Sequence, residues 1–390
     1  MLNNEILLVF GEDYGRHPHC LEHIINELLP NNTVLWIETI GMRSPRFSLY
    51  DMQRSLQILA KWIFGRKKTS AKDLDKNLKI IAPVMLPFTS LRAIRKINQV
   101  FTARKIKQEI KKRGLARPIF ITSIPGVCDF AKKFQEKLTV YYCVDEFSLW
   151  PGIPHARVKM MEEELMSKSD IIFATSSALA DSKKASGKET YLLTHGVDVK
   201  HFELNETFYT ANIWKKRICY FGLIDERCDQ KLIAFLAHSL PDCLFTIIGE
   251  VTVADTFFLK KHSNVCFERR VSYEALPAKI KDQDYFILPY HINELTNNIN
   301  PLKIKEYLAT GRPVISTPLP EVVKLAKFLY VAGNQNDFVK IIKGLMSGEF
   351  IYSSSPTLQY LEDHETWKAK AAYFCQKMNK AILTKELSMQ

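Results

Sequence analysis

The stretch that decides the fold runs from Asn293 to Glu321 and reads NELTNNINPLKIKEYLATGRPVISTPLPE. A polar loop ends at Asn300-Pro301, and a segment typical of a helix leads from there to Gly311. Proline at the start of a helix and glycine just past its end are the usual punctuation of a short helix. The apolar run from Val314 to Ser316 then follows as a strand. Loop, helix and strand in this order predict one unit of a parallel α/β sheet.

The start of this helix is suited to a phosphate group. Its first N–H groups have no acceptor within the helix, and they carry the positive end of the helix dipole. Glu306 follows about one turn later, where a carboxylate can accept hydrogen bonds from a ribose diol. The stretch therefore predicts half of a nucleotide-sugar site. The residues expected to bind the donor here are Asn300, Pro301, Leu302, Lys303 and Glu306.

The same stretch resembles the donor-binding segment of GT-B glycosyltransferases, in particular the GT4-like retaining enzymes of bacterial polysaccharide assembly. Their pattern is Pro-x-Lys-x-x-Glu-Tyr-x-Ala-x-Gly-x-Pro-Val. It is met by Pro301, Lys303, Glu306, Tyr307, Ala309, Gly311, Pro313 and Val314. Many of these enzymes carry a second Glu eight residues before the first, and this chain has Asn298 there. Glu294 is the nearby acid that could substitute for it.

Length and composition favour a two-domain globular protein of the cytoplasm. The chain has 390 residues, which exceeds one ordinary core. Its hydrophobic content is 46% and its charged content 25%, as in soluble globular proteins. No apolar run approaches the ~18 residues that span a bilayer, and the start, MLNNEILLVF, is typical of a first strand rather than a signal peptide. The eight Cys lack a C-x-x-C pair, which favours reduced thiols over disulfides or a zinc site.

The formal charge of +12 is concentrated in one segment. Lys61–Arg113 holds sixteen Lys and Arg against three Asp and Glu. Its apolar residues recur near helical spacing, which predicts a helix with a core-facing stripe. That stripe comprises Leu91, Ile94, Ile97, Val100, Phe101 and Ile106. The cations fit a solvated helix, an anionic membrane surface or an acidic polysaccharide; lipid is favoured. Nucleic acid is not expected, because a recognition motif and interleaved exposed aromatics are missing.

Short β-type segments alternate with helical patterns along the chain, which predicts parallel sheets with right-handed crossovers. The first set of strands is Ile6–Phe10, Thr33–Glu38, Leu78–Ile81, Ile119–Thr122, Thr139–Cys143, Ile171–Ala174 and Tyr191–Leu193. The second set is Arg217–Phe221, Leu244–Ile248, Val265–Phe267, Tyr285–Leu288, Val314–Ser316 and Phe328–Val331. The helices expected between them include His19–Leu29, Ala93–Lys112, Ala156–Lys168, Gln230–His238, Tyr273–Ile280 and Asn336–Met346. A polar linker is expected at 201–216.

The fold expected is α/β, with two Rossmann-like doubly wound domains that face each other across a cleft, as in the GT-B architecture. We assign residues 1–200 to an acceptor-binding domain and 217–360 to a donor-binding domain. Residues 361–390 are helical in pattern, and the resemblance implies that this helix crosses back to the N-terminal domain.

The resemblance also implies roles for residues outside the quoted stretch. Gly222 ends a strand where related enzymes bind the diphosphate, and Arg227 offers a planar cation just beyond it. Gly249 repeats the strand–glycine pattern, and Arg270 precedes a segment whose backbone commonly contacts the nucleobase. The catalytic residues expected are Arg227, Glu294 and Glu306.

The acceptor side is expected in the N-terminal half. The loop after the first strand resembles the acceptor loop of GT-B enzymes and contributes Glu12, Asp13 and Arg16. Asp145 follows a later strand, and His195 stands where the family commonly has Asn in Asn-Gly-Val-Asp. No third ligand accompanies His17 and His19 at a useful spacing, so no metal site is predicted.

The function expected is retaining, metal-independent transfer of a sugar from a nucleotide diphosphate to a glycan or lipid-linked acceptor in cell-surface polysaccharide biosynthesis. The co-substrate is expected to be a UDP- or GDP-sugar, with no further cofactor. The enzyme is expected to be cytoplasmic, with a peripheral site on the inner face of the membrane through Lys61–Arg113. Two alternatives stay open: a non-hydrolysing UDP-sugar epimerase, and a catalytically retired assembly protein, which Asn298 in place of Glu would suit.

Overall fold

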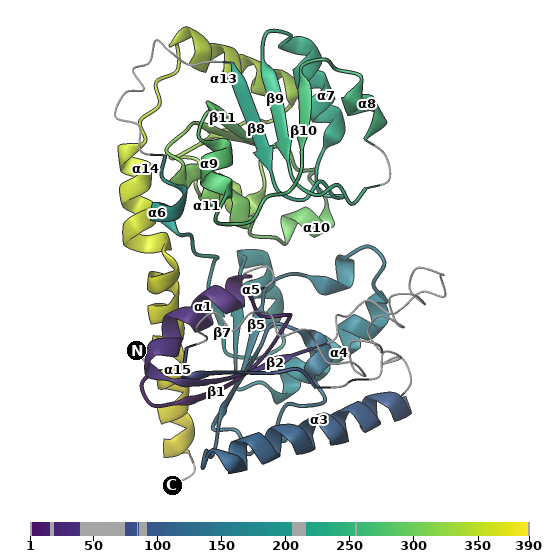
Figure 1. Cartoon of the computed structure of the whole chain (residues 1–390), viewed down its shortest axis with the longest axis vertical. Helices are drawn as coiled ribbons and strands as arrows, with labels where there is room; N and C mark the ends of the chain where they lie inside the picture. The colour runs from purple at the N-terminus through teal and green to yellow at the C-terminus, as the bar shows by residue number, and fades with distance from the viewer. Residues whose placement is uncertain are drawn as a thin grey trace. The chain divides into compact units, whose positions relative to one another are not determined.

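A computed structural model describes residues 2–15, 19–39, 75–83, 85, 92–204, 216–253 and 256–388. The chain divides into two compact units (Figure 1). The first comprises Met1–Thr194 and Lys370–Gln390, and the second comprises His195–Ala369. Within the described ranges, every helix is too short or too polar to traverse a lipid bilayer.

The first unit is built on a seven-stranded parallel sheet in the order β3-β2-β1-β4-β5-β6-β7. Its strands are β1 Ile6–Gly11, β2 Thr33–Glu38, β3 Leu78–Ile81, β4 Ile119–Thr122, β5 Leu138–Cys143, β6 Ile171–Ala174 and β7 Thr190–Leu192. Every residue of β4, β5 and β6 is buried. Helices that cover both faces of a parallel sheet explain why these strands are continuously apolar in sequence.

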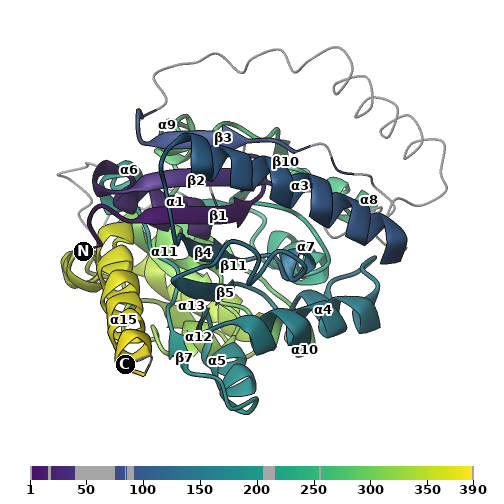
Figure 2. The same cartoon turned by 90° about the horizontal axis from the view of Figure 1, so that it is seen from below.

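The helices of the first unit connect successive strands. They are α1 Cys20–Leu28, α3 Arg92–Lys112, α4 His155–Lys168 and α5 Ser177–Lys184, with short 3-10 turns at Leu29–Asn31, Pro125–Val127 and Phe147–Leu149. Figure 2 shows α3 as a long straight helix next to β2 and β3 of this unit.

The C-terminal helix α15, Trp367–Leu387, enters the first unit at Lys370. There the Lys370 ammonium donates to the hydroxyl of Thr194 at 2.9 Å, and the ring of Phe374 packs on that of Phe173 with centroids 4.5 Å apart. Lys385 pairs with Asp170 at 2.9 Å near the other end of the helix. The return of the C-terminal helix to the N-terminal domain, expected from the family resemblance, is confirmed.

The second unit holds a six-stranded parallel sheet in the order β10-β9-β8-β11-β12-β13. Its strands are β8 Arg217–Phe221, β9 Leu244–Ile248, β10 Val265–Glu268, β11 Tyr285–Leu288, β12 Val314–Ser316 and β13 Tyr330–Val331. Its helices are α6 Val199–Phe202, α7 Gln230–Ser239, α8 Phe257–Lys260, α9 Leu276–Ile280, α10 Glu294–Asn297, α11 Leu302–Ala309, α12 Pro320–Val323, α13 Gln335–Ser347 and α14 Ser355–Tyr360, followed by a π-turn at Leu361–Glu365. The predicted pair of Rossmann-like sheets is confirmed.

The chain enters and leaves the second unit through adjacent segments. The Val197 N–H donates to the Glu365 carbonyl at 2.8 Å, and a Cβ on Gly196 would lie 2.7 Å from the ring of Trp367. Lys305 of α11 joins these segments, because its ammonium donates to the His195 carbonyl and the Glu365 carboxylate. Helix α11 is therefore fixed to both connections.

Three local expectations need comment. Helix α9 begins at Leu276 rather than Tyr273, and Pro277 lies in its first turn, where the missing N–H of proline costs no helical hydrogen bond. Residues 205–215 of the expected linker lie outside the described residues, and Val199–Phe202 before them is helical. All eight cysteines are free and seven are buried, so the expectation of reduced thiols agrees with the structure.

The core-facing stripe expected on α3 is wrong in part. Ile106 is fully buried, but Ile97, Val100 and Phe101 are 43%, 53% and 66% exposed. The buried positions next to Ile106 are instead Asn98 and Thr102. Spacing alone could not distinguish the two faces, because two of the buried positions are polar residues, Asn98 and Thr102. Leu91 lies outside the described residues.

Candidate functional site

The direction of the second sheet's strand order reverses between β8 and β11. In open parallel sheets, ligands bind outside the carboxyl ends of the strands at such a switch point. Strand β8 runs into Gly222 there, and β11 runs into Pro289 and Tyr290. The donor residues predicted from the sequence should therefore be found around these two strand ends.

Gly222 and Gly249 are adjacent at the ends of neighbouring strands. Their φ angles are +135° and +154°, which side-chain-bearing residues rarely adopt. A Cβ on Gly249 would lie 1.9 Å from the Gly222 carbonyl oxygen, and one on Gly222 would lie 1.7 Å from Cε of Lys303. Only glycine fits at either position. The predicted glycines and Lys303 of α11 are thus brought into one place.

Lys303 is held by aromatic groups. Its ammonium donates to the Tyr290 hydroxyl at 3.0 Å and lies 5.5 Å and 5.7 Å from the ring centroids of Tyr220 and Tyr290. No carboxylate in the described part of the chain forms an ion pair with it. A lysine placed beside strand-end glycines, with its charge not neutralised by an acid, can bind an anionic ligand.

Tyr220 and Tyr290 were not predicted as site residues. Each looks like a core aromatic in sequence, and each is buried, with 1% and 2% exposure. Only the pairing of β8 with β11 brings the two rings together under Lys303. A signal existed in the position of Tyr290 just after the Tyr285–Leu288 strand, where parallel strands present ligand contacts.

Arg227 is oriented by a neighbour that the sequence analysis did not single out. Its Nε donates to the carboxylate of Asp225 at 3.0 Å, and its Nη2 also binds this group. Asp225 is buried, and the Arg227 guanidinium lies 5.6 Å from the centroid of the Tyr290 ring. Arg227 and Lys303 therefore flank the same tyrosine, with the Arg227 charge shared with Asp225.

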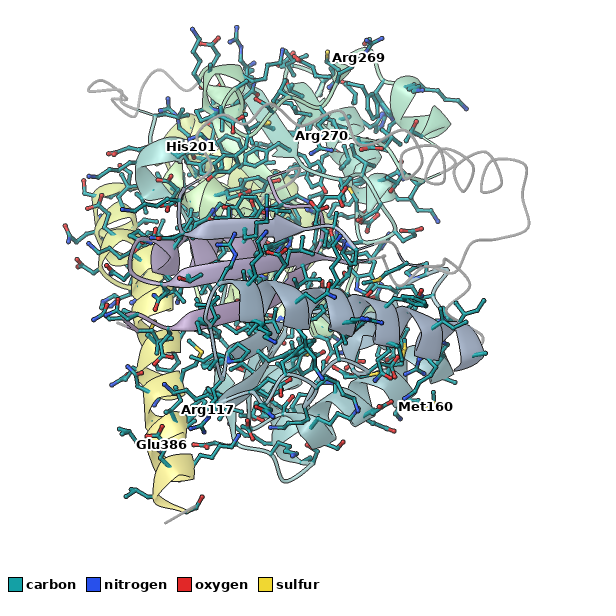
Figure 3. All side chains as sticks on the ribbon, turned by 60° about the horizontal axis from the view of Figure 1, so that its bottom comes forward. Arg117, Met160, His201, Arg269, Arg270 and Glu386 are labelled. Atoms are coloured by element: carbon teal, nitrogen blue, oxygen red, sulfur yellow. The ribbon has the colours of Figure 1, made fainter. Side chains whose placement is uncertain are left out.

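Glu306 is a half-buried carboxyl on α11, three residues after Lys303. Burial raises its pKa to about 7, although the Lys303 cation acts in the opposite direction. Within the described residues the carboxylate accepts no hydrogen bond. The negative charge of Glu306 helps to raise the pKa of Tyr273, although burial is the larger cause. The Tyr273 ring stacks on that of His201, which is labelled in Figure 3, with the ring centroids 4.1 Å apart. Glu306 can thus accept hydrogen bonds from a ligand.

The start of α11 differs slightly from the prediction. Pro301 is the N-cap and Leu302 the first helical residue, with no side chain capping the helix. Asn300 is 7% exposed, and in the described part of the chain its side-chain oxygen has no hydrogen-bond partner. The helix start therefore keeps open backbone donors, and it is preceded by a buried amide with an unfilled acceptor.

Arg270 and Glu294 are more exposed. Arg269 and Arg270 share the loop after β10 (Figure 3), and Arg270 lies 3.8 Å from Glu250. Glu294 opens helix α10, and its backbone carbonyl accepts from the Asn298 side chain at 2.7 Å. The Asn298 side chain thus caps a carbonyl group of α10. The Glu294 side chain is exposed and forms no ion pair within the described residues.

The residues predicted for the acceptor side are divided between the units. Glu12 is exposed and Asp13 half-buried at the end of β1, where the first sheet has its own switch point beside β4. Asp145 is half-buried after β5. His195 is buried and is the first residue of the second unit. Arg16 lies outside the described residues.

The first switch point also contains an acid that the sequence analysis missed. Glu22 of α1 is 2% exposed, and its carboxylate accepts from the Gly15 N–H at 3.0 Å. Its second oxygen has no hydrogen-bond partner among the described residues. Burial raises the pKa of Glu22 to about 7, opposed by the Gly15 hydrogen bond. In sequence it is an acid in the first turn of a helix, where such residues are common.

Near Asp145 in sequence, Glu146 and Glu162 form ion pairs with one lysine, Lys183. Lys183 of α5 is 4% exposed and lies 2.9 Å from Glu162 and 3.3 Å from Glu146. The Tyr141 hydroxyl donates to Glu162 at 2.7 Å. Burial alone would lower the pKa of Lys183, but the Cys143 thiol and the two carboxylates raise it. These charges are therefore paired within the first unit.

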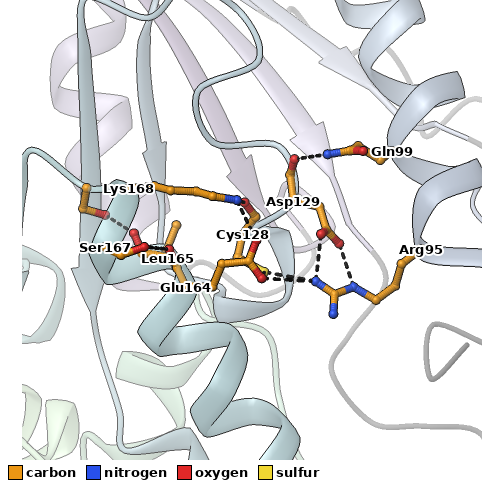
Figure 4. A network of polar contacts seen from close by, with 9 residues as sticks. Arg95, Gln99, Cys128, Asp129, Glu164, Leu165, Ser167 and Lys168 are labelled. Carbon is orange, nitrogen blue, oxygen red and sulfur yellow. Dashed lines mark hydrogen bonds and ion pairs between the residues drawn. The ribbon is translucent and has the colours of Figure 1, made fainter. Parts of the chain in front are cut away.

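One group in the described part of the chain has the residue types of a metal site. The ligand atoms of Cys128, Asp129 and Glu164 lie within 4.8 Å of one another. Figure 4 shows that both carboxylates already form ion pairs with basic side chains. Arg95 donates to Asp129 at 2.7 and 2.8 Å, and Lys168 lies 2.6 Å from Glu164. Burial raises the pKa of Cys128 to about 12, so this donor set suits an ion-pair network better than a metal.

Comparison with known proteins shows similarity to glycosyltransferases. Residues 215–348 match the sequence model of glycosyl transferases group 1. The putative teichuronic acid biosynthesis glycosyltransferase TuaH of Bacillus subtilis (strain 168) is 28% identical over 243 residues. The alignment covers 56% of this chain and 60% of TuaH.

Solved structures share the fold over nearly the whole chain. HepE of Anabaena in complex with UDP-glucose has a TM-score of 0.65 at 11% identity, and the match covers 96% of this chain and 99% of HepE. Sucrose-phosphate synthase of Thermosynechococcus elongatus has a TM-score of 0.71 at 12% identity, with coverage of 98% and 100%. The chain has the GT-B fold, and its residues 215–348, which contain the cluster around Lys303, match the sequence model of glycosyl transferases group 1.

Proposed function

We propose that this protein is a retaining, metal-independent glycosyltransferase that moves a sugar from a nucleotide diphosphate to a glycan or lipid-linked acceptor in polysaccharide assembly. The observation that carries the proposal is Lys303, which lies on the backbone of Gly222 at the switch point of the second sheet. Glu306 follows one turn later on the same helix.

In this proposal the diphosphate binds between Gly222 and the start of α11. The glycine lets the phosphate approach the backbone closely, and the open N–H groups at the helix start donate to it. Lys303 supplies the positive charge and is kept in place by the Tyr290 hydroxyl. As the glycosidic bond lengthens, negative charge grows on the leaving diphosphate, and these pre-placed groups stabilise it.

Arg227 and Glu306 act on either side of this centre. Asp225 orients the Arg227 guanidinium, so little reorganisation is required when the leaving group becomes more negative. Glu306 accepts from the ribose hydroxyls and fixes the nucleoside. Retention follows from attack on the face that the leaving group departs from, so no nucleophilic carboxylate is required.

The relatives support a nucleotide-sugar donor. HepE was solved with UDP, with UDP and glucose, and with UDP-glucose. TuaH is named for the assembly of a polysaccharide, teichuronic acid. We therefore propose a UDP- or GDP-sugar as donor and a growing cell-surface glycan as acceptor.

Calorimetric titration with UDP, GDP and ADP tests the donor half of the proposal. We expect the unmodified protein to bind UDP or GDP, and Lys303→Met to weaken that binding. Lys281→Met is the matched control, since Lys281 is an exposed lysine of the same unit, and it should bind as the unmodified protein does. Absence of binding to all three nucleotides, or equal losses in both variants, would overturn the assignment.

The transfer half is tested by product analysis. Incubation with a UDP-sugar and without acceptor should leave the sugar unchanged apart from slow hydrolysis. Formation of an epimer would instead identify a sugar epimerase on the same fold. With a suitable glycan acceptor, the new linkage should keep the anomeric configuration of the donor; inversion would contradict the retaining mechanism.

A further inference from the structure

Helix α3 is fixed to the first unit by polar contacts. Arg95 donates to both carboxylate oxygens of Asp129, and the Gln99 amide donates to the Asp129 carbonyl (Figure 4). Asn98, Thr102 and Ile106, spaced four residues apart, form its buried stripe. Ile106 is the fully buried apolar side chain of this stripe, and half-buried Ile110 also packs against the core.

The opposite face of α3 presents large apolar side chains to solvent. Ile97, Val100 and Phe101 are 43%, 53% and 66% exposed. At 3.6 residues per turn, Val100 and Ile97 lie about 160° and 140° around the helix from Thr102, and Phe101 lies about 100° from it. Exposed apolar residues scattered singly are ordinary, but three within one and a half turns form a patch that suggests a partner.

Cations border this apolar patch along the helix. Lys96, Arg104, Lys107 and Lys111 share the stripe that contains Val100, at spacings of four, four, three and four residues along the helix. With Lys133 from a neighbouring turn, they line a hollow of about 490 Å³. Within the described residues none of Lys96, Arg104, Lys107 and Lys111 forms an ion pair. Their charge is therefore available to a partner.

We propose that the outer face of α3 binds an anionic lipid bilayer. A helix that lies in the membrane interface carries lysines and arginines on a polar border and aromatic or aliphatic residues between them. The long basic side chains reach toward lipid phosphates while their stems and the apolar patch enter the headgroup boundary. An acidic polysaccharide would satisfy the charges but would leave Val100, Ile97 and Phe101 without an apolar environment.

This surface is independent of the proposed donor site. It lies on the first unit, whereas Gly222, Lys303 and Glu306 belong to the second. Membrane binding can therefore be measured without a known acceptor, and the free energy of unfolding serves as the test of correct folding of the first unit.

Co-sedimentation of the full chain with vesicles tests the proposal. We expect binding to phosphatidylcholine vesicles that contain phosphatidylglycerol and no binding to pure phosphatidylcholine. Binding should weaken as salt rises, because the Debye length shortens from ~10 Å at 0.1 M to ~3 Å at 1 M. Equal binding to neutral vesicles, or no binding to anionic ones, would overturn the proposal.

Two variants separate charge from apolar insertion. The charge variant replaces Lys96, Arg104, Lys107 and Lys111 by Gln, and we expect at least about ten-fold weaker binding to anionic vesicles. The insertion variant combines Val100→Ser with Phe101→Ser, keeps the net charge, and should bind several-fold more weakly. Unfolding curves and UDP binding check that both variants are folded.

A matched control removes the same charge elsewhere. Lys260, Lys281, Lys340 and Lys343 are exposed lysines of the second unit, and their replacement by Gln should leave vesicle binding within about two-fold. An equal loss in this control would show attraction by net charge alone. Polygalacturonate, a soluble acidic polysaccharide, tests the rival partner: tight binding that the charge variant abolishes and the insertion variant retains would assign the face to acidic glycan.

Discussion

Lys183 in the first unit and Lys303 in the second have opposite surroundings. Lys183 is buried between two carboxylates at 2.9 Å and 3.3 Å, and each partner is itself partly or fully buried. Lys303 contacts a tyrosine hydroxyl and two tyrosine rings, and no carboxylate of the described residues pairs with it. The first charge is neutralised by the fold, and the second is left for a ligand.

The same contrast separates two glutamates. Glu162 is buried beside Lys183 and also accepts from Tyr141. Glu306 is half-buried, accepts no hydrogen bond from the described residues and has a pKa raised to about 7 by burial. Charged groups that cost stability without a partner in the chain are where a ligand is expected. The comparison teaches that pairing, rather than burial, distinguishes the candidate site from the structural cluster.

Replacing Lys183 by Met should give the largest effect, on stability. Glu146 and Glu162 would lose their cation, and breaking a buried pair by removal of one partner costs ~3–5 kcal/mol. Chemical denaturation should show this loss in the free energy of unfolding, while nucleotide affinity of the folded protein stays the same. Lys184→Met is the control, because its side chain is 55% exposed, and a similar loss there would contradict the contrast.

Replacing Lys303 by Met should act on the ligand instead. Methionine keeps the length of the side chain over Gly222 but removes the charge. Charged hydrogen bonds contribute ~1.5–3 kcal/mol, so we expect nucleotide diphosphate affinity to fall roughly 10–150-fold. The free energy of unfolding should change little. A variant that loses stability and keeps its affinity would show that Lys303 is structural.

Glu306→Gln should have a smaller effect, with a distinct pH dependence. A neutral amide accepts ribose hydroxyls about half as strongly as a carboxylate, which predicts a loss of ~1 kcal/mol in donor affinity at pH 8. The ionised form binds the ribose, so affinity of the unmodified protein should fall as pH drops below about 7. Calorimetry should be done across pH 5.5–8.5, a range of about three units around this value. Donor affinity should fall at low pH for the unmodified protein and should not change with pH for Glu306→Gln.

Stability should respond to pH in the opposite direction. The pKa of Glu306 in the folded protein exceeds its ordinary value, so the folded state holds the proton more tightly than the unfolded chain. The contribution of Glu306 to stability is therefore fully present below its ordinary pKa and declines as pH rises to about 7. If unfolding curves of the unmodified protein and Glu306→Gln have parallel pH dependence, the raised pKa is wrong.

Much of the candidate site could be predicted because it is local in sequence. Lys303 and Glu306 lie on one short helix, and its punctuation by Pro301 and Gly311 is visible without a structure. Gly222 could be predicted from its position after a strand. The alternation of strands and helices likewise predicted both sheets, because continuous apolar runs arise wherever helices cover both faces.

What could not be predicted depends on long-range pairing. Tyr290 becomes a site residue only because β11 lies next to β8, and Asp225 matters only because it binds Arg227. The inner face of α3 was assigned wrongly because Arg95 and Asp129, 34 residues apart, fix how the helix is turned. Periodicity finds a helix but does not say which stripe meets the core.

The smallest expected effect is that of metal removal. Magnesium binds oxygen ligands, usually one or two carboxylates together with substrate phosphates. In the second unit the acid nearest Arg227 is Asp225, and the guanidinium already occupies it. Glu306 lies three residues beyond a lysine that is expected to supply positive charge to the diphosphate. EDTA should therefore change the transfer rate by less than about two-fold, against EDTA saturated with magnesium as the control. A large loss that added Mg²⁺ or Mn²⁺ restores would mean that Lys303 shares its role with a metal, and the contrast between the two lysines would then describe only half of the donor site.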